Sequence, residues 1–588
     1  MNDPIAYELV VSWTPRALAI AAAAAGVLAL FMSRPVRWRF AAGYFLLYLP
    51  VPLILVALAH GPFDAMDGFQ RDPTHVHLGL AYMFVVLVMS AYLALGVWLV
   101  AKDRGDRIVA LSLAVAALAV YLVVLPYQPA VRDLVSDEPH YLVFTQSLWL
   151  DQDLNLANDY TRDPYMGFWP ERLPDVHAVW TAGGLFPIRE PGFPLLLVVP
   201  FGLAGRYGVL RMLVVLGVVL VVQLYFLLRD VGIDRRVAAP VVLVVALTHP
   251  LISYTTQVFP ELPVALGLVT AARVLRRGPN ASALALGLAS AIAGLMPWLT
   301  VRALPLGVAV VACAIVWATD LRKLTSLKIR RLAAAVVPFT MGFGALGVLN
   351  QSMFGDWTPG AGARLFYVSK PFVSTPTFAP QIGGLGLFID RVFGLFRNSP
   401  EYVLVLIGVV PLLALLRRRS PIAIVLCAAS VPYLVAIANF FYWHADWSPP
   451  PRYLVSVLPA LVLLFALAWA RLRQMPRAAI AVAGSLCLLS VGTTYLFLAH
   501  PSLMYNWGTL EVAVAWTPGV LGLFLQRWLH VDPGALYPSL WWPDAWSFAT
   551  AAAWLIVGAL LIAAGRSHVT PTRKLPAAIR SAASSSAR

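Results

Sequence analysis

Cysteine and charge are both scarce in this chain. Of its 588 residues only 3 are cysteines, Cys313, Cys427 and Cys487, and each lies in an apolar segment. Three isolated cysteines support neither a disulfide framework nor a zinc cluster. Charged residues make up 12% of the chain, whereas a soluble domain carries roughly 25%. The composition therefore excludes an ordinary soluble protein.

Acidic residues are scarcer than basic ones. The chain has 28 Asp and Glu residues against 43 Lys and Arg residues, and its formal net charge is +15. In a soluble protein this excess would suggest nucleic-acid binding, but basic loops at a membrane surface explain it better in so apolar a chain. Nucleic acid is therefore discarded as a partner.

Long apolar runs dominate the rest of the sequence. Hydrophobic residues make up 60% of the chain, and its mean hydropathy is +0.77. Because roughly 20 apolar residues span a bilayer as a helix, the runs predict an all-α, polytopic helical membrane protein with about 13 to 15 transmembrane helices. The expected spans lie near 13–32, 41–59, 76–100, 108–127, 208–228, 238–256, 260–275, 281–298, 303–318, 332–350, 401–416, 421–440, 453–470, 478–498 and 547–565.

Lys and Arg gather in every second loop, which predicts the orientation of the helices. Because basic loops face the cytoplasm, the chain is expected to be a multi-pass protein of the cell (plasma) membrane with a cytoplasmic C-terminus. The stretches 193–205 and 513–525 are too short to cross and are expected at the membrane surface. The regions are 1–107 (additional N-terminal transmembrane helices), 108–350 (a transmembrane module with the extracytoplasmic loop 128–192), 351–565 (C-terminal transmembrane helices and outer loops) and 566–588 (a disordered basic cytoplasmic tail).

The loop 128–192 is the most polar part of the chain. Within it, Asp137-Glu138-Pro139-His140-Tyr141 begins an amphipathic stretch, and Pro139 suits the first turn of a helix. The acid pair has an explanation without function, since carboxylates stabilise a helix N-terminus by about 0.3–1 kcal/mol. From these residues alone, the catalytic and the capping interpretations both stay open.

The ordered motifs resemble those of the GT-C superfamily of membrane glycosyltransferases, over roughly residues 108–500. Asp137-Glu138 followed by His140 is similar to the Asp-Glu-x-His motif of the protein O-mannosyltransferases. Two features depart from the superfamily pattern: three spans precede the one that leads to the acid pair, and Thr300 stands where a histidine is expected. The other motifs that carry the resemblance are Arg189–Leu195, Pro260–Pro263, Pro297–Arg302, Phe388–Pro400 and Trp443–Pro459.

The resemblance implies transfer of a sugar from a polyprenyl-phosphate donor to a cell-envelope acceptor on the extracytoplasmic face. The acceptor would be a glycan, a lipid-linked molecule or a protein. Asp137 would take the proton of the acceptor hydroxyl with support from Glu138, and a single displacement would invert the anomeric centre.

Cationic and polar residues in the outward loops supply further candidates for the site. The alternative interpretations are snorkelling for Arg302, helix capping for Glu261 and a structural hydrogen bond for His444. No cofactor is predicted and a divalent metal ion is left open, because Asp137, Glu138 and His140 are hard ligands at a spacing that fits no dedicated site. Candidates for the donor phosphate are Arg302, Arg452 and Arg364, and those for the substrate are His140, Tyr141, Glu261, His444 and Asp446.

A transporter or flippase for a lipid-linked sugar is the alternative function. Transporters concentrate functional charge near the bilayer midplane, whereas this chain places its acids in one outer loop. A scaffold without chemistry is favoured least, because a helical bundle needs no long acidic loop. Consumption of a labelled lipid donor, as opposed to its relocation across the bilayer, separates the enzyme from the transporter.

Overall fold

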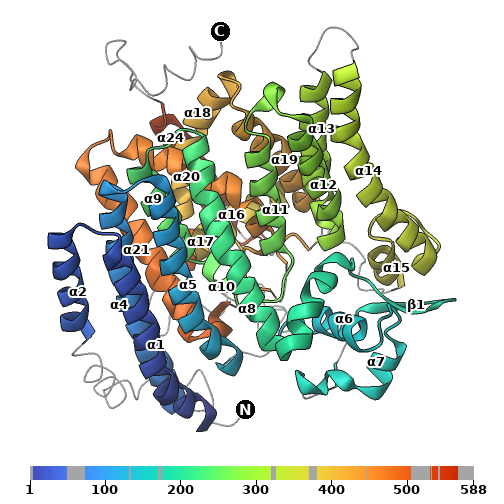
Figure 1. Cartoon of the computed structure of the whole chain (residues 1–588), viewed down its shortest axis with the longest axis horizontal. Coiled ribbons are helices and arrows are strands. Elements are labelled where there is room, and N and C mark those ends of the chain that lie inside the picture. The colour runs from blue at the N-terminus through green and yellow to red at the C-terminus, as the bar shows by residue number, and fades with distance from the viewer. Residues whose placement is uncertain are drawn as a thin grey trace.

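The described residues form a bundle of long helices with one small two-stranded sheet (Figure 1). The fold of the protein is given by a computed structural model. The residues that the structure describes are 4–48, 73–131, 134–169, 172–173, 176–319, 326–369, 380–440, 442–445, 448–504, 530, 533–540, 543 and 545–566.

Four helices among the described residues precede the acidic loop. Helices α1, α4 and α5 pack against one another, and small side chains such as Ala21 and Ala117, both fully buried, let their backbones approach closely. The four helices are α1 (Pro4–Leu30), α2 (Arg34–Tyr48), α4 (Pro73–Asp103) and α5 (Asp106–Val131).

The acidic loop folds against one end of the bundle, at the lower right of Figure 1. Its hairpin is antiparallel, with Val179 opposite Phe186 and Thr181 opposite Gly184. The elements of the loop are α6 (Glu138–Leu150), α7 (Ala157–Arg162), η2 (Pro164–Gly167), β1 (Ala178–Thr181) and β2 (Gly184–Pro187).

Helix α8 (Gly192–Asp230) follows the hairpin and is broken near its start. Ala204 and Gly205 have non-helical backbone angles, and Gly205 has a φ of +55°, which a residue without a Cβ adopts easily. The short helix before the break exposes the apolar side chains of Leu195, Val199 and Leu203. The break thus separates a short apolar helix from the span that follows it, as the length of 193–205 predicts.

The described residues that follow α8 are also mainly helical. Their 3-10 helices are η3 (Gly278–Asn280), η4 (Val301–Ala303), η6 (Pro400–Leu404), η7 (Arg452–Val457), η8 (Pro501–Met504) and η9 (Pro533–Leu536). Their α-helices are α9 (Arg235–Leu247), α10 (Leu251–Tyr254), α11 (Glu261–Val274), α12 (Ala283–Leu299), α13 (Leu304–Thr319), α14 (Ser326–Phe354), α15 (Ala361–Ser369), α16 (Pro380–Ile389), α17 (Leu395–Asn398), α18 (Val405–Arg417), α19 (Pro421–Ala438), α20 (Leu458–Leu472), α21 (Arg477–Ala499) and α24 (Ala545–Ala564).

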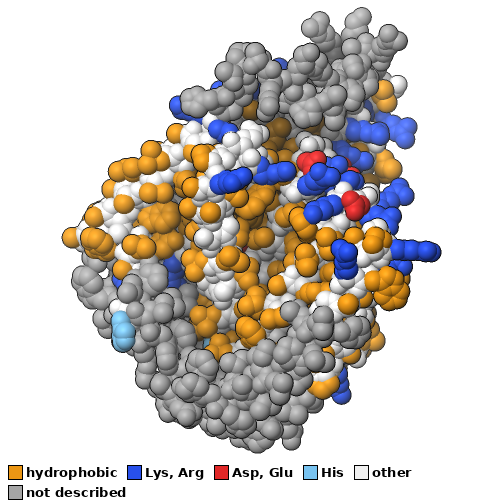
Figure 2. Space-filling model, turned by 90° about the vertical axis from the view of Figure 1, so that its left-hand side faces the viewer, with side chains coloured by type: hydrophobic (Ala, Val, Ile, Leu, Met, Phe, Trp, Pro, Cys, Tyr) orange, Lys and Arg blue, Asp and Glu red, His pale blue; other side chains and the backbone are white. Residues whose placement is uncertain are grey.

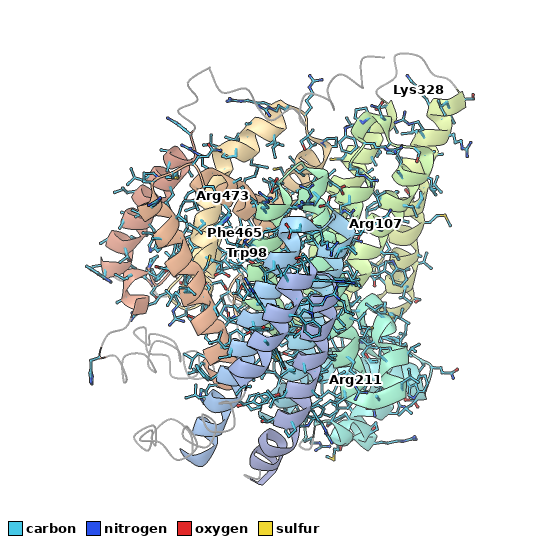
Figure 3. All side chains as sticks on the ribbon, turned by 60° about the vertical axis from the view of Figure 1, so that its left-hand side comes forward. Trp98, Arg107, Arg211, Lys328, Phe465 and Arg473 are labelled. Atoms are coloured by element: carbon cyan, nitrogen blue, oxygen red, sulfur yellow. The ribbon has the colours of Figure 1, made fainter. Side chains whose placement is uncertain are left out.

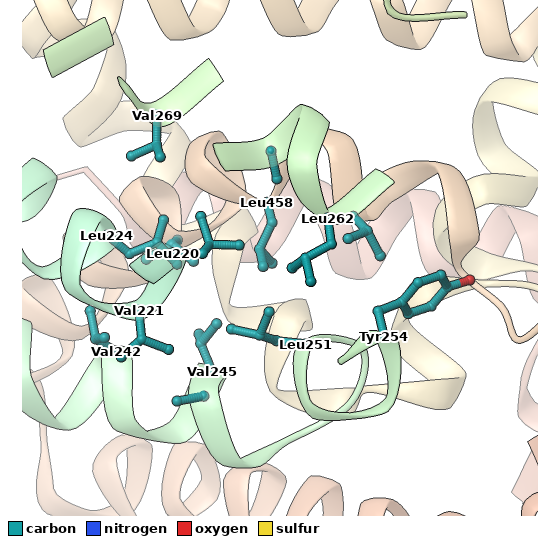
Figure 4. Packing of buried hydrophobic residues seen from close by; sticks show 14 of the residues in the cluster. Leu220, Val221, Leu224, Val242, Val245, Leu251, Tyr254, Leu262, Val269 and Leu458 are labelled. Carbon is teal, nitrogen blue, oxygen red and sulfur yellow. The ribbon is translucent and has the colours of Figure 1, made fainter. Parts of the chain in front are cut away.

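A central part of the core lies where α8, α9, α11 and α20 meet (Figure 4). Leu220, Val245, Leu262 and Leu458 come from these four helices, and each is fully buried. Because lipid is as apolar as these side chains, close packing holds the helices together more than removal from water does. This packed centre supports the start of α11 and of η7, which both contribute to the site.

Eleven helices among the described residues are long and apolar enough to cross a membrane. The expected polytopic helical membrane fold is confirmed. Four of the fifteen expected spans are not among the eleven. Much of 41–59 lies outside the described residues, and α9, α11 and α12 have only 13, 14 and 17 residues.

The two ends of the bundle differ in charge. Figure 3 places Arg107, Lys328 and Arg473 toward one end, here called the basic end, and α6 with its neighbours toward the other, called the site end. At the basic end Arg229 pairs with Asp106, with Nε 3.0 Å from Oδ1. Figure 2 shows one lateral face, on which hydrophobic side chains cover the middle and Lys and Arg gather mainly above it. Such a belt suits contact with lipid.

Candidate active site

Asp137 lies at the site end, directly before α6. The backbone turns at Ser136, whose φ is +54°, and Asp137 occupies the cap position of the helix. Its side chain makes no capping hydrogen bond and is almost fully buried. Capping therefore does not explain the carboxylate, which instead faces cationic side chains from other segments.

Two arginines hold the Asp137 carboxylate. Arg189 Nη2 donates to Oδ1, and Arg452 Nη1 lies 3.0 Å from Oδ2. Nδ1 of His177 lies 3.3 Å from Oδ1. Arg189 comes from the segment between β2 and α8, whereas Arg452 begins η7, so the site joins three segments that are far apart in sequence.

Arg452 links Asp137 to a second buried carboxylate. Its Nε donates to Glu261 Oε1 at 2.8 Å, and its guanidinium lies over the Phe259 ring at 4.1 Å. Glu261 begins α11 and is 1% exposed, and its Oε2 has no hydrogen-bond partner among the described residues. Buried charges are costly, and polar groups left unpaired at membrane depth indicate function.

Arg302 completes a group of three arginines, Arg189, Arg302 and Arg452, here called the arginine cluster. The Arg302 guanidinium lies 4.9 Å from the ring of Tyr453, and the three guanidinium groups are close enough to repel one another. Within the described part of the chain, Nε and Nη2 of Arg302, Nε of Arg189 and Nη2 of Arg452 are buried without a hydrogen-bond partner. Because buried donors are normally satisfied, these groups indicate a site for an anion.

The charges around Asp137 determine its pKa. Burial alone would raise the pKa of Asp137, but Arg189, Arg452 and His177 outweigh it and hold that pKa well below its ordinary value. Asp137 is therefore ionised at neutral pH and able to accept a proton. Its pairing with two arginines also makes it a weak base in this state.

Glu138 fastens α6 to the bundle. It is fully buried, its Oε2 accepts a hydrogen bond from the Val135 backbone N–H at 3.0 Å, and its Oε1 accepts one from the Val258 backbone N–H at 2.7 Å. Hydrogen bonds to a charged group are worth about 1.5–3 kcal/mol each. Since Val258 lies just before α11, Glu138 aligns the two segments that carry Asp137 and Glu261.

His140 and Tyr141 lie on the first turn of α6. The His140 ring stacks on His177 with centroids 3.7 Å apart, and its Nδ1 lies 3.0 Å from the Tyr160 hydroxyl. Tyr141 is buried and packs edge-on against Phe193 at 5.0 Å. His140 thus neighbours Asp137 through His177, whereas the Tyr141 ring packs in the core.

Two predicted residues, Arg364 and His444, are not brought to Asp137 by these contacts. Arg364 lies on the surface, where its Nη2 is 2.6 Å from Asp356 Oδ2. His444 is buried, with its ring 4.9 Å from that of Phe393, and burial lowers its pKa to about 3, so it is neutral at pH 7. Asp446 lies outside the described residues.

The sequence did not single out Arg189 and His177 as site residues. Arg189 opens the Arg189–Leu195 motif at the entry to a long apolar run, so its position carried a signal. His177 is a single histidine in a polar loop, and no pattern in the chain marks it. Its contact with Asp137 exists only because the hairpin folds back beside α6.

The surroundings of Asp137 do not suit a divalent cation. Both of its carboxylate oxygens are paired with guanidinium groups, and a third arginine lies nearby, so a bound cation would be repelled. The described ranges contain no group of three His, Cys, Asp or Glu side chains that could hold a metal ion.

Comparison with known proteins finds a structural likeness but no match to a protein family. No protein-family model matches the chain, and no curated protein matches it. Among solved structures, the chain is similar to ArnT from Cupriavidus metallidurans, whose crystal structure has undecaprenyl phosphate bound. The two are 16% identical in sequence, the match covers 79% of this chain and 74% of ArnT, and the TM-score is 0.41.

Proposed function

We propose that this protein is a membrane glycosyltransferase. It transfers a sugar from a polyprenyl-phosphate donor to a cell-envelope acceptor on the extracytoplasmic face, with Asp137 as the base. The observation that carries the proposal is the buried Asp137 carboxylate, which pairs with two members of a cluster of three arginines whose buried N–H groups include several with no partner among the described residues. A proton acceptor and an anion site side by side are what this reaction needs.

The proposed reaction is a single displacement at the anomeric carbon. The acceptor hydroxyl oxygen attacks that carbon while Asp137 takes the hydroxyl proton. The bond from the anomeric carbon to the phosphate oxygen breaks, and polyprenyl phosphate leaves with the electron pair. Attack from the side opposite the leaving group inverts the anomeric centre, since no covalent intermediate forms.

The arginine cluster supports the departure of the phosphate. The leaving group gains one negative charge as the bond breaks, and guanidinium groups fixed beforehand stabilise that charge without reorganising. Within the part of the chain that the structure describes, two N–H groups of Arg302 and one of Arg452 have no hydrogen-bond partner. Glu261 orients Arg452 through Nε.

The position of the site favours a lipid-borne donor. The site end lies opposite the basic end (Figure 3), and basic loops face the cytoplasm. Nucleotide sugars are cytoplasmic, so an extracytoplasmic site needs a sugar carried by a lipid. The GT-C-like order of the motifs in the sequence agrees with this reaction.

The test is transfer of radiolabelled sugar from a panel of polyprenyl-phosphate donors into membrane acceptors. Wild type and Asp137→Asn are compared at matched expression and at a temperature at which both proteins are folded. We expect transfer to fall at least about a hundredfold in Asp137→Asn, as is typical for loss of a general base. Asp230→Asn is the matched control, because it removes an aspartate paired with Arg273 at the basic end.

Each outcome of this test has a distinct meaning. Transfer by wild type and by Asp230→Asn, but not by Asp137→Asn, supports both the reaction and the base. Transfer by Asp137→Asn at the wild-type rate refutes the assignment of Asp137 as the base. If wild-type membranes move the labelled donor across the bilayer but never consume it, the protein is a transporter and the proposal is wrong.

A further inference from the structure

A donor phosphate and Asp137 compete for the same arginines. We propose that Arg189 and Arg452 form an electrostatic latch on Asp137, and that the phosphate of an incoming polyprenyl donor opens it. This inference depends on the proposed function, because it assigns the regulation of the same site. Donor binding then converts Asp137 from a paired, weak base into one able to take the acceptor proton.

The geometry of the two guanidinium groups carries this inference. Arginine binds phosphate most strongly through two neighbouring N–H groups that form a fork. In Arg452 the spare Nη2 is the partner of Nη1, which holds Asp137 Oδ2. In Arg189 the spare Nε is the partner of Nη2, which holds Oδ1. Each fork therefore has one open position and one occupied by Asp137.

A phosphate that takes either fork must displace the carboxylate from it. Arg302 forms no ion pair with Asp137, and two of its N–H groups have no partner among the described residues, so it gives the phosphate a first contact. Glu261 keeps Arg452 in place through Nε during the exchange. The latch thus opens when the phosphate replaces the Asp137 carboxylate on the guanidinium groups. An anion therefore faces the arginine cluster before and after the exchange.

Displacement changes the proton affinity of Asp137. The two arginines hold the pKa of this carboxyl low, and a phosphate that takes their N–H groups also places a second negative charge beside it. Both effects favour proton uptake by Asp137. Coupling between two sites is reciprocal, so if the phosphate weakens the hold on Asp137, Asp137 must weaken the binding of phosphate by the same factor.

This reciprocity supplies a test that needs no transfer activity. Binding of farnesyl phosphate to the full-length protein in detergent is measured by calorimetry, with farnesol as the uncharged control. We expect Asp137→Asn to bind farnesyl phosphate about tenfold more tightly than wild type, which corresponds to 1.4 kcal/mol. Farnesol binding should not change.

The same substitution made in a protein that already carries Arg189→Gln distinguishes the latch from simple repulsion between two negative charges. If Asp137 and the phosphate share the arginines, Asp137→Asn should raise the affinity for farnesyl phosphate only about threefold in the Arg189→Gln protein, because only Arg452 remains to be released. If Arg189→Gln does not fold, Arg189→Lys replaces it, since lysine keeps the charge but has no fork. The same gain in both backgrounds, or weaker binding by Asp137→Asn, overturns the latch.

The two proposals fail in different ways. If wild type does not bind farnesyl phosphate more tightly than farnesol, the phosphate site is wrong and the proposed function falls with it. If wild type prefers the phosphate but Asp137→Asn gives no gain, only the latch is overturned.

Discussion

A single methyl group at Gly192 should displace the site without unfolding the protein. Gly192 begins α8 and follows Arg189 by three residues, so the start of this helix determines where Arg189 lies. A Cβ at Gly192 would lie 2.6 Å from both the Cβ and the carbonyl oxygen of Trp298, at the end of α12. Since ordinary contact begins near 3.4 Å, the two segments must separate by roughly 0.8 Å (3.4 − 2.6).

The expected effect of Gly192→Ala is larger on catalysis than on stability. Overpacking of this kind costs about 1–3 kcal/mol, which a large helical bundle tolerates. A shift of about 1 Å in a residue that positions reacting groups costs up to about a hundredfold in rate. The measurements are the sugar-transfer rate and the melting temperature of the purified variant.

Two further variants make the prediction specific. Gly344→Ala, in α14, is the matched control because a Cβ there meets nothing within 4 Å, and it should transfer sugar at the wild-type rate. Trp298→Ala should not rescue Gly192→Ala, because the clash is with the Cβ and backbone that alanine keeps. Wild-type transfer by Gly192→Ala would refute the reasoning.

The remaining predictions concern the charged groups of the site. Glu138→Gln places an N–H group against a backbone N–H and should cost about 1–3 kcal/mol of stability, read as a lower melting temperature; an unchanged melting temperature contradicts the structural role. Arg302→Gln should weaken farnesyl phosphate binding at least about tenfold. Arg364→Gln should weaken it less than about twofold, because Arg364 is half-exposed and paired with Asp356, and equal losses would mean that the phosphate binds elsewhere. Folding lowers the pKa of Asp137. Its ion pairs therefore stabilise the folded protein at pH values above the ordinary aspartate pKa of about 4, and this stabilisation is lost as the pH falls through the pKa of the folded state. The difference between the melting temperatures of wild type and Asp137→Asn should therefore be constant above about pH 5 and shrink in acid. A difference that grows in acid would contradict the lowered pKa of Asp137.

The spans could be predicted from the sequence because hydropathy is a property of each segment by itself. The stretches that became α5, α13 and α21 were located to within a few residues. The end of α9 was not, because the expected span 238–256 continues past Leu247, where the chain turns inside the bundle at the buried Thr248. A buried polar turn at membrane depth depends on neighbouring helices and leaves little trace in a hydropathy pattern.

The same division applies to the site. The acid pair Asp137-Glu138 could be identified from the sequence because two adjacent carboxylates before an amphipathic stretch form a local pattern. The sequence could not assign the two acids their different partners. One carboxylate faces arginines and the other faces backbone N–H groups, although the residues are neighbours, because the first turn of α6 points them in different directions.

By itself the sequence determined that this chain lies in a membrane, where its helices run and which loop carries its acids. These features follow from the free energy of moving each short segment from water into lipid, which depends on local composition. Only the tertiary structure decided that Arg189 and Arg452 share one carboxylate and leave N–H groups open for an anion. Ion pairs between distant segments depend on distances of a few ångströms, and those distances exist only after the helices have packed.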